Sequence, residues 1–523
     1  MIPSTAAAVA ALLALPTERP SLIVAPAVEN ERPTVEVTST TVSGWHAGDA
    51  GYGDLFERLN LTTSLGSMQL GLRGDSASFI RPPSPAVAGR YTLEKIWLTW
   101  TGRSLELVAG DAYISFGRGL ALSLRKVDEL GLDTTLRGVK ALVHGDRMGG
   151  TLAAGITNTN NVDEASGKSI DDPRDAIAAA RVELTTPNGI TLGAHGTAVA
   201  FHHPLSLAET GNYDDRYLQF GPTIDAPRLT DWLGIYLEGI GQIRRTEADP
   251  GGSPAYGAYG AATADFGRIA LLMEGKAYGA LAPVKPRVER PEFATIAYNN
   301  PPTVERLLQI LENPQRDIVG GRLRVEWRAT PDISFYVNGG LFHDAQGYAD
   351  PTRVGDIVPG TIYDPYVGLE ARAPDGRSWL LASAGSRLVF LNGSQVLVRR
   401  DSHLEVDAAR SLGGSWSATL HAIHEERLKY ESALLNRHFR EGTTLLGVRR
   451  SPWGSVAIGY DYTTDPTQPR RDYWNGNAEW NITASSSVRL FVGGTRGGLR
   501  CVSGVCRVFP PFEGVKVSAT IRF

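Results

Sequence analysis

The chain ends in the stretch Val515-Lys-Val-Ser-Ala-Thr-Ile-Arg-Phe523, in which apolar and polar side chains alternate without a break. Successive side chains of a β-strand point to opposite faces, so the valines, Ala519, Ile521 and Phe523 share one face. Lys516, Ser518, Thr520 and Arg522 share the other face. One face suits an apolar environment and the other suits water, which predicts an amphipathic strand at the end of the chain.

The same alternation recurs upstream, from about residue 33 onward. In residues 322–328, Leu323, Val325 and Trp327 share one face, whereas Arg322, Arg324, Glu326 and Arg328 share the other. A soluble core does not tolerate four charged side chains on one inner face, but a water-filled lumen does. Comparable patterns occupy residues 68–75, 403–408 and 474–482.

Short connections rich in turn residues alternate with long segments along the chain. The short ones include Leu65-Gly66, Gly102-Arg103, Phe266-Gly267, Leu412–Gly414 and the ranges 186–189, 329–332, 373–376 and 451–454. The long ones are 116–136, 159–174, 281–316, 344–362, 427–440 and 498–513. This rhythm is typical of a membrane barrel with short periplasmic turns and long extracellular loops.

The composition bounds the fold and the partners. The 523 residues are 42% apolar with 58 glycines and 31 prolines, and no stretch reaches the roughly 18 apolar residues of a spanning helix. The 52 basic and 56 acidic residues give a net charge of -4, which offers no reason to expect nucleic acid as a partner. We predict an all-β fold, a single large transmembrane antiparallel up-and-down β-barrel of about 24 strands (roughly 22 to 26) over residues 33–523. A tandem of soluble sheets would share the alternation, but the number and order of the segments favour one closed barrel.

Two stretches resemble known proteins. The terminal strand resembles the closing strand of bacterial outer-membrane β-barrels, whose last phenylalanine, here Phe523, is read by the barrel-assembly machinery. Residues 110–138 resemble a signature of an uncharacterised outer-membrane barrel family, matched at Gly110, Asp111, Tyr113, Phe116, Gly117, Gly119, Leu130, Gly131, Asp133, Leu136, Arg137 and Gly138. The resemblance implies a porin-like barrel in the outer membrane of a Gram-negative bacterium, in contact with outer-membrane lipid.

The ends of the chain carry two further patterns. The apolar run Ala6–Leu15 and the A-x-A pattern of residues 25–27 predict a signal peptide over residues 1–27, although the usual basic start is missing. Residues 28–32 would then form a short N-terminal segment, too short for a globular plug. Cys501 and Cys506 are spaced to close a disulfide in a tight loop.

Two long segments are candidate functional elements. Segment 116–136 is rich in charge and can fold into the lumen as a constriction, or its charges can simply tie it to the barrel wall. Its candidate binding or constriction residues are Arg118, Arg125, Lys126, Asp128, Glu129, Asp133 and Arg137. Segment 281–316 carries a helical pattern after Thr303, whose apolar stripe can dock on the barrel rim or on a partner.

Nothing in the sequence indicates catalysis. His202, His203, His421 and His424 lack nearby acidic or cysteine ligands at metal-binding spacing, and no nucleophile elbow or phosphate-binding loop is present. We therefore expect no enzyme activity, no metal site and no cofactor.

The leading hypothesis is a porin-like channel for a hydrophilic solute. The predicted lumen-facing residues mix both signs of charge, so strong ion selectivity does not follow; they include Arg322, Arg324, Glu326, Arg328, Glu405, Asp407, Glu479, Arg489, Lys516 and Arg522. The alternative is a plugged barrel that acts as a surface anchor or docking component of an envelope complex.

Overall fold

The computed structural model describes most of the chain. The described residues are 32–48, 51–82, 89–163, 168–169, 172, 174–202, 214–246, 251–281, 298–304, 317–351, 356–394, 396–432, 435–468, 470–502 and 505–523. The predicted signal peptide at 1–27, segment 28–31, His203 and nearly all of the predicted helix after Thr303 lie outside them.

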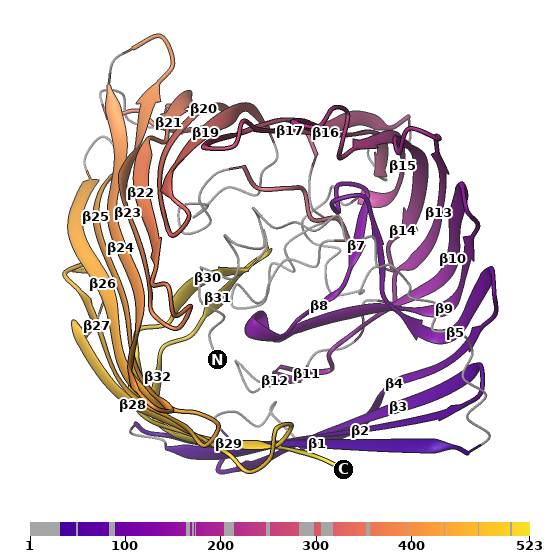
Figure 1. Cartoon of the computed structure of the whole chain (residues 1–523), viewed down its shortest axis with the longest axis horizontal. Helices are drawn as coiled ribbons and strands as arrows, with labels where there is room; N and C mark the ends of the chain where they lie inside the picture. The colour runs from indigo at the N-terminus through magenta and orange to yellow at the C-terminus, as the bar shows by residue number, and fades with distance from the viewer. Residues whose placement is uncertain are drawn as a thin grey trace.

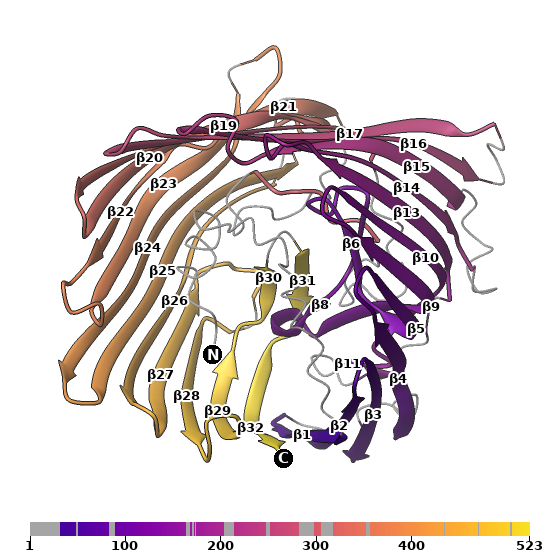
Figure 2. The ribbon, with the colours of Figure 1, turned by 45° about the vertical axis from the view of Figure 1, so that its right-hand side comes forward.

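The strands close into one antiparallel barrel with 24 strand positions, which we call staves, and this confirms the predicted fold (Figures 1 and 2). The ring closes where β1 pairs with β32, with Thr38 opposite Arg522. The staves are β1 (Thr34–His46), β2 (Tyr52–Leu65), β3 (Met68–Ile80), β4 (Arg90–Thr101), β5 (Leu105–Ala112), β9 (Leu132–His144), β10 (Met148–Thr159), β13 (Ala176–Thr185), β14 (Thr191–Ala200), β15 (Asp214–Ala226), β16 (Leu233–Thr246), β17 (Ser253–Asp265), β18 (Ile269–Gly279), β19 (Ile318–Thr330), β20 (Ile333–Ala349), β21 (Ile357–Tyr363) with β22 (Tyr366–Arg372), β23 (Trp379–Leu391), β24 (Leu397–Gly413), β25 (Trp416–Ser432), β26 (Leu435–Arg450), β27 (Gly454–Thr463), β28 (Asp472–Asn481), β29 (Ser487–Thr495) and β32 (Phe512–Arg522).

One stave is interrupted. β21 and β22 are separated by Asp364 and Pro365, and both pair with β20 on one side and β23 on the other. Proline has no backbone N–H to donate to a sheet, so the ladder breaks at this position. The two pieces together still fill a single place in the ring.

The connections alternate in length as the sequence predicts. The turns at Leu65-Gly66, Gly102-Arg103 and the other predicted positions each join two neighbouring staves. They lie at the end of the barrel where β1 begins and β32 ends. We call this the periplasmic end and the opposite one the extracellular end.

Three predicted loop boundaries are wrong. Segment 427–440 is not a loop, because β25 and β26 continue as a paired hairpin to Ser432 and Leu435. In the segment 344–362, β20 runs to Ala349 and β21 begins at Ile357. Segment 116–136 ends earlier than predicted, since β9 begins at Leu132 and places Asp133 and Arg137 on the barrel wall. In each case the strands extend beyond the apolar stretch that marks them in sequence.

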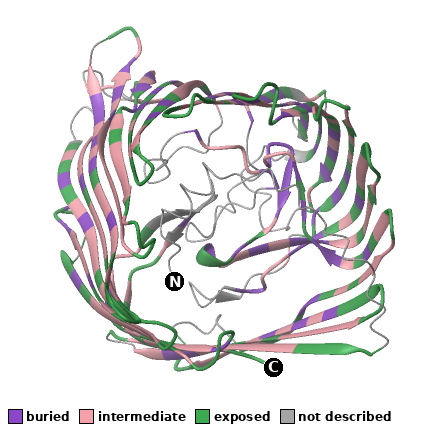
Figure 3. Cartoon of the chain, viewed as in Figure 1, coloured by how far each residue is buried: buried purple, intermediate pink, exposed green. Residues whose placement is uncertain are grey.

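The outer face of the ring carries the large apolar side chains. On β19, Leu323, Val325 and Trp327 are exposed, whereas Arg324 and Glu326 are buried. Buried and exposed positions alternate along the staves in Figure 3. In a closed barrel the backbone N–H and C=O groups pair between neighbouring strands, so no sheet edge is left open. The apolar outer surface can then face lipid. In the described residues, no helix has the length and apolar character to cross a membrane.

Trp97 points inward, because it lies between the outward-facing side chains of Ile96 and Leu98. Its ring covers Gly71 on the neighbouring strand β3, where an added Cβ would lie 2.0 Å from a ring carbon. Outward aromatic side chains remain at Trp100, Trp327, Trp416, Tyr460, Tyr462, Trp474 and Trp480.

Candidate functional site

Residues 113–131, which we call the inward segment, connect β5 to β9 and lie inside the ring (Figures 1 and 2). The segment contains β6 (Ile114–Phe116), β7 (Leu122–Leu124), β8 (Lys126–Val127) and the 3-10 turn η1 (Asp128–Leu130). β6 and β7 pair with each other, and β8 pairs with the start of β9. The inward segment is therefore an ordered hairpin with a folded tip.

An apolar core holds the inward segment to the inner wall. Phe116, Leu120, Leu122 and Leu124 are at most 1% exposed. They belong to one cluster with inward-facing wall residues, which include Ile177, Val199, Tyr217, Ile240, Tyr259, Ile318 and Phe342. Each fully buried side chain of this size contributes about 1.5–3 kcal/mol, so the segment is packed rather than merely tethered.

Arg118 anchors the tip of the β6–β7 hairpin to β16 and β17. Its guanidinium carbon lies 4.4 Å from the ring centroid of Tyr236 and 5.4 Å from that of Tyr259, and its Nη1 donates to the Tyr259 hydroxyl at 3.1 Å. Its backbone N–H donates to Glu238 Oε2 at 2.8 Å, and the Tyr236 hydroxyl donates to the same oxygen at 2.7 Å. The guanidinium group of Arg118 therefore binds side chains of the barrel wall.

Further polar contacts fix the hairpin. The side-chain amide of Gln219 donates to the carbonyl oxygen of Ala121, and the amide of Gln242 donates to Gln219 Oε1 at 3.0 Å. On its other side the hairpin meets residues 298–304. The Ser123 N–H donates to the Tyr298 carbonyl at 2.7 Å, and the Asn300 N–H donates to the Gly119 carbonyl at 2.7 Å. The long segment between β18 and β19 therefore contributes to the same internal layer.

Tyr298 is completely buried in this layer. Its hydroxyl donates to Asp175 Oδ2 and contacts Thr157 Oγ1 at 3.3 Å. Burial, followed by the negative charge of Asp175, raises the pKa of the Tyr298 phenol well above its ordinary value. Tyr298 therefore stays protonated and keeps its hydrogen bond.

Asp133 ties the base of the inward segment to the wall. Its carboxylate accepts from the Tyr113 hydroxyl at 2.8 Å and from Arg73 Nη1 at 2.5 Å, and it lies 3.0 Å from Lys95 Nζ. All three charged groups are buried. Arg137 is bound in a similar way, because its Nη2 lies 3.1 Å from Asp111 Oδ2. These charges bind the segment to the barrel wall, which is one of the two alternatives that the sequence leaves open.

The tip of the inward segment meets a second inward element. The hairpin of β30 (Gly498–Val502) and β31 (Val505–Phe509) lies inside the ring beside η1 (Figure 1). Arg507 Nη1 donates to the carbonyl oxygen of Leu130 at 2.8 Å. Cys501 and Cys506 face each other in the backbone register of this hairpin. The two elements form a bridge inside the barrel, and the two residues in contact, Leu130 and Arg507, are 377 positions apart in the sequence.

The predicted candidates therefore divide into two groups. Arg118, Asp133 and Arg137 are bound by the wall, and Arg125 is half-buried. Lys126, Asp128 and Glu129 are exposed at the tip, where Lys126 Nζ lies 2.7 Å from Asp128 Oδ1. These three residues are the exposed charged groups of the candidate set.

The remaining wall carries paired charges on its inner face. Arg427 lies 2.6 Å from Glu425 Oε2 and 2.8 Å from Glu441 Oε1, and the His421 ring lies 2.6 Å from Asp407. Of the other predicted lumen residues, Arg322 pairs with Glu274, Arg324 with Glu326 and Glu370, Arg328 with Asp265, Glu405 with Ser383, Arg489 with Glu479 and Arg522 with Glu36, while Lys516 lies 5.2 Å from the Phe512 ring centroid. Paired charges of both signs give a polar wall with little net field.

The apolar core inside the barrel was missed by the sequence reasoning, which predicts polar inner faces. Its wall residues, such as Ile177, Val199 and Tyr217, have inward parity and lie near the extracellular ends of β13, β14 and β15. Apolar residues at inward positions on several neighbouring strands are the signal that could have indicated a covered wall.

No group of three or more potential metal ligands exists among the described residues. His421 faces inward and contacts Asp407, whereas His424 faces outward and stacks on Tyr462. These two histidines therefore act in hydrogen bonding and ring packing.

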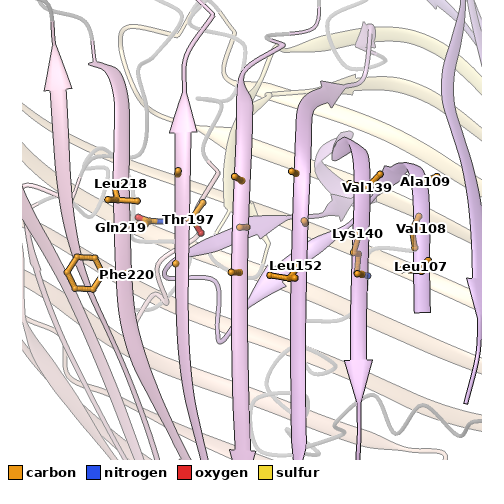
Figure 4. Close-up of a pocket in the computed structure, with 18 of the residues that line it drawn as sticks. Leu107, Val108, Ala109, Val139, Lys140, Leu152, Thr197, Leu218, Gln219 and Phe220 are labelled. Carbon is orange, nitrogen blue, oxygen red and sulfur yellow. The ribbon is translucent and has the colours of Figure 1, made fainter. Parts of the chain in front are cut away.

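A hollow of about 1050 Å³ lies on the outer face of the wall that holds the inward segment (Figure 4). Its floor is made of small outward residues such as Ala141, Ala154 and Ala198, and Leu107, Leu152 and Phe220 stand around it. It faces the lipid side.

A closed barrel with an apolar outer band, polar inner charges, short turns and long loops is an outer-membrane β-barrel of the Gram-negative type. A model of a family of unknown function, DUF6029, matches residues 443–523, from within β26 to the C-terminus. No curated protein matches the sequence.

Solved structures similar to the chain are barrels as well. The siderophore receptor PirA from Pseudomonas aeruginosa has 10% identity and a TM-score of 0.47, with 94% of this chain and 81% of that chain covered. The translocation pore of the P pilus usher PapC has 11% identity and a TM-score of 0.40, with 94% and 99% covered. The outer membrane protein opdK from Pseudomonas aeruginosa has 12% identity and a TM-score of 0.37, with 72% and 98% covered. At this level of similarity they carry no argument about cargo.

Proposed function

We propose that the protein is a porin-like channel that lets a hydrophilic solute cross the outer membrane, and that the bridge of the inward segment and the β30–β31 hairpin narrows its lumen. The observation that carries the proposal is the position of this bridge. Its wall side is fixed by the apolar core and by Arg118, and its tip presents charged side chains inside the ring. A rigid element with a charged free edge can filter solutes by size and charge.

The experiment is single-channel recording with the purified full chain in planar bilayers. We expect discrete conductance steps, and the channel proposal fails if correctly folded protein gives none. The tip carries Asp128 and Glu129 against Lys126, so a slight preference for cations is expected. Glu129→Lys should then move the reversal potential in a salt gradient toward anion preference.

A plugged barrel that serves as an anchor or docking component of an envelope complex is the second candidate. The observation in its favour is that three elements, the inward segment, residues 298–304 and the β30–β31 hairpin, contribute to the interior. Purification in mild detergent distinguishes the two functions. A partner recovered in stoichiometric amount with a non-conducting barrel favours the anchor, and a conducting barrel recovered alone favours the channel.

We further propose three features of its biogenesis: removal of a signal peptide over residues 1–27, recognition of Phe523 by the barrel-assembly machinery, and a disulfide between Cys501 and Cys506. The opposed backbone positions of the two cysteines support the disulfide. Intact-mass measurement of the exported protein, with and without reduction, tests both the cleavage and the disulfide.

A further inference from the structure

A charged cluster stands on the outer face of β24, β25 and β26, which lie side by side (Figures 1 and 2). Glu426 is its centre. The carboxylate of Glu426 lies 2.6 Å from His438 Nε2, 3.8 Å from Arg400 Nη2 and 4.0 Å from Arg440 Nε. Because one carboxylate faces two guanidinium groups and an imidazole, the cluster has an excess of cationic groups.

The outward direction of these residues follows from the strand register. Arg440 is paired with Glu426, and Gly442 with His424, one step closer to the periplasm. Arg400 and His438 both pair with Leu428, one step farther from it. All of them share the face of the outward apolar residues Leu446 and Val448, so the cluster does not belong to the lumen.

An aromatic row directly below the cluster marks the membrane boundary. The rings of His424 and Tyr462 are stacked with centroids 6.1 Å apart, Tyr462 and Tyr460 are 5.9 Å apart, and Tyr460 and Trp474 are 4.4 Å apart. Aromatic side chains of this kind gather at the level of the lipid head groups.

The distance from the aromatic row to the periplasmic membrane boundary supports the placement of the row at the extracellular boundary. Trp416 lies at the periplasmic end of β25, eight residues before His424. Eight residues span about 27 Å along a strand, or about 20 Å along the axis of a barrel tilted by about 40°. That height is close to the roughly 25 Å apolar band of outer-membrane barrels. Glu426 lies about 7 Å farther along β25, just outside the band on the extracellular side.

The basic side chains of the cluster are only partly engaged by contacts within the protein. Arg440 and His438 have side chains that are 59% and 52% exposed, and the two arginines are at the long limit of an ion pair with Glu426. Arg400 Nε is buried and has no hydrogen-bond partner among the described residues. The other acid nearby on this face, Asp472, accepts a hydrogen bond from the Tyr460 hydroxyl at 2.5 Å.

We propose that Arg400, His438 and Arg440 form a binding site for the phosphate group of an outer-leaflet glycolipid. Guanidinium groups bind phosphate with charge-assisted hydrogen bonds, and basic groups at a membrane surface attract anionic head groups. The acyl chains of the same molecule would lie along the apolar face below, past the aromatic row. The site is independent of the lumen, so it does not depend on the channel proposal.

The test is the binding of lipid A, the phosphorylated glycolipid anchor, to the detergent-purified full chain by native mass spectrometry. We expect Arg400→Gln with Arg440→Gln to weaken binding about 25-fold, from about fivefold for each guanidinium group. Glu426→Gln should instead strengthen binding, by about fivefold, because it releases the cations from their internal carboxylate. Heat-dependent electrophoretic mobility shows that each variant is folded.

The same strands supply a matched control. Arg410 on β24 and Arg450 on β26 face outward at the periplasmic end, ten residues from Arg400 and Arg440. Arg410→Gln with Arg450→Gln should leave lipid A binding unchanged. Equal loss in both double variants would overturn the proposal, as would equal binding of dephosphorylated lipid A.

Two further outcomes decide the remaining cases. If inorganic phosphate displaces lipid A at equal molar concentration, the cluster is an adventitious anion site and the proposal is wrong. If the Arg400/Arg440 double variant does not fold, Glu426→Gln decides alone, and unchanged or weaker binding by that variant overturns the proposal.

Discussion

At the scale of single residues, charge in this barrel serves mainly to fix structure. The sequence makes Arg118 a candidate constriction residue, yet its guanidinium lies over the ring of Tyr236 and donates to the Tyr259 hydroxyl. Arg118 is half-buried, so its cation–π contact contributes about 1 kcal/mol and the hydrogen bond about as much again. Arg118→Ala should therefore accelerate local opening of the inward segment about 30-fold, measured by hydrogen exchange of its backbone amides.

Lys126 provides the comparison for Arg118. Its pairing with Asp128 is exposed, and exposed ion pairs contribute about 0–1 kcal/mol. Lys126→Ala should change the same exchange rates by less than about fivefold. Similar acceleration in both variants would show that Arg118 does not anchor the segment.

At the scale of elements, the β6–β7 hairpin depends on Gly117. Gly117 has a φ of 54°, and a Cβ there would lie 2.5 Å from Glu238 Oε2 on the wall. Gly117→Ala therefore combines backbone strain of about 1–2 kcal/mol with a clash at the wall. We expect it to release the inward segment, so that trypsin cleaves the folded barrel after Arg118 or Arg125.

Gly66 separates these two effects. It has a φ of 56° in the turn between β2 and β3, and a Cβ added there would have no other atom within 4 Å. Gly66→Ala should lower the free energy of unfolding by about 1–2 kcal/mol and leave the inward segment resistant to trypsin. Cleavage in both variants would mean that a general loss of barrel stability, and not the contact with Glu238, releases the segment.

At the scale of the whole molecule, the ring was predictable, whereas for its contents the sequence offered an inward fold of segment 116–136 as one alternative and gave none of its contacts. Each stave carries its own period-two pattern, as in residues 322–328, so local sequence is enough to predict strands, turns and closure. The contacts that place the inward segment join residues about 100 or more positions apart, such as Arg118 with Glu238 and Ala121 with Gln219. No local pattern encodes such pairings, and Ile177 or Val199 on an inner face look like exceptions until the segment that covers them is known.

Closure of the ring separates two roles of Phe523, the last residue. Its backbone N–H donates to the Val37 carbonyl at 2.9 Å and its carbonyl accepts from the Val37 N–H at 3.2 Å, while its side chain is 77% exposed. Phe523→Ala keeps both backbone bonds, so we expect the refolded barrel to lose about 1 kcal/mol or less in urea unfolding. If the phenyl ring is the assembly signal, the same variant should reach the outer-membrane fraction of cells several-fold less. Ile521→Ala, on the same face of β32, should show a similar small loss in stability with normal assembly. Equal amounts of the two variants in the outer membrane would contradict a signalling role for Phe523.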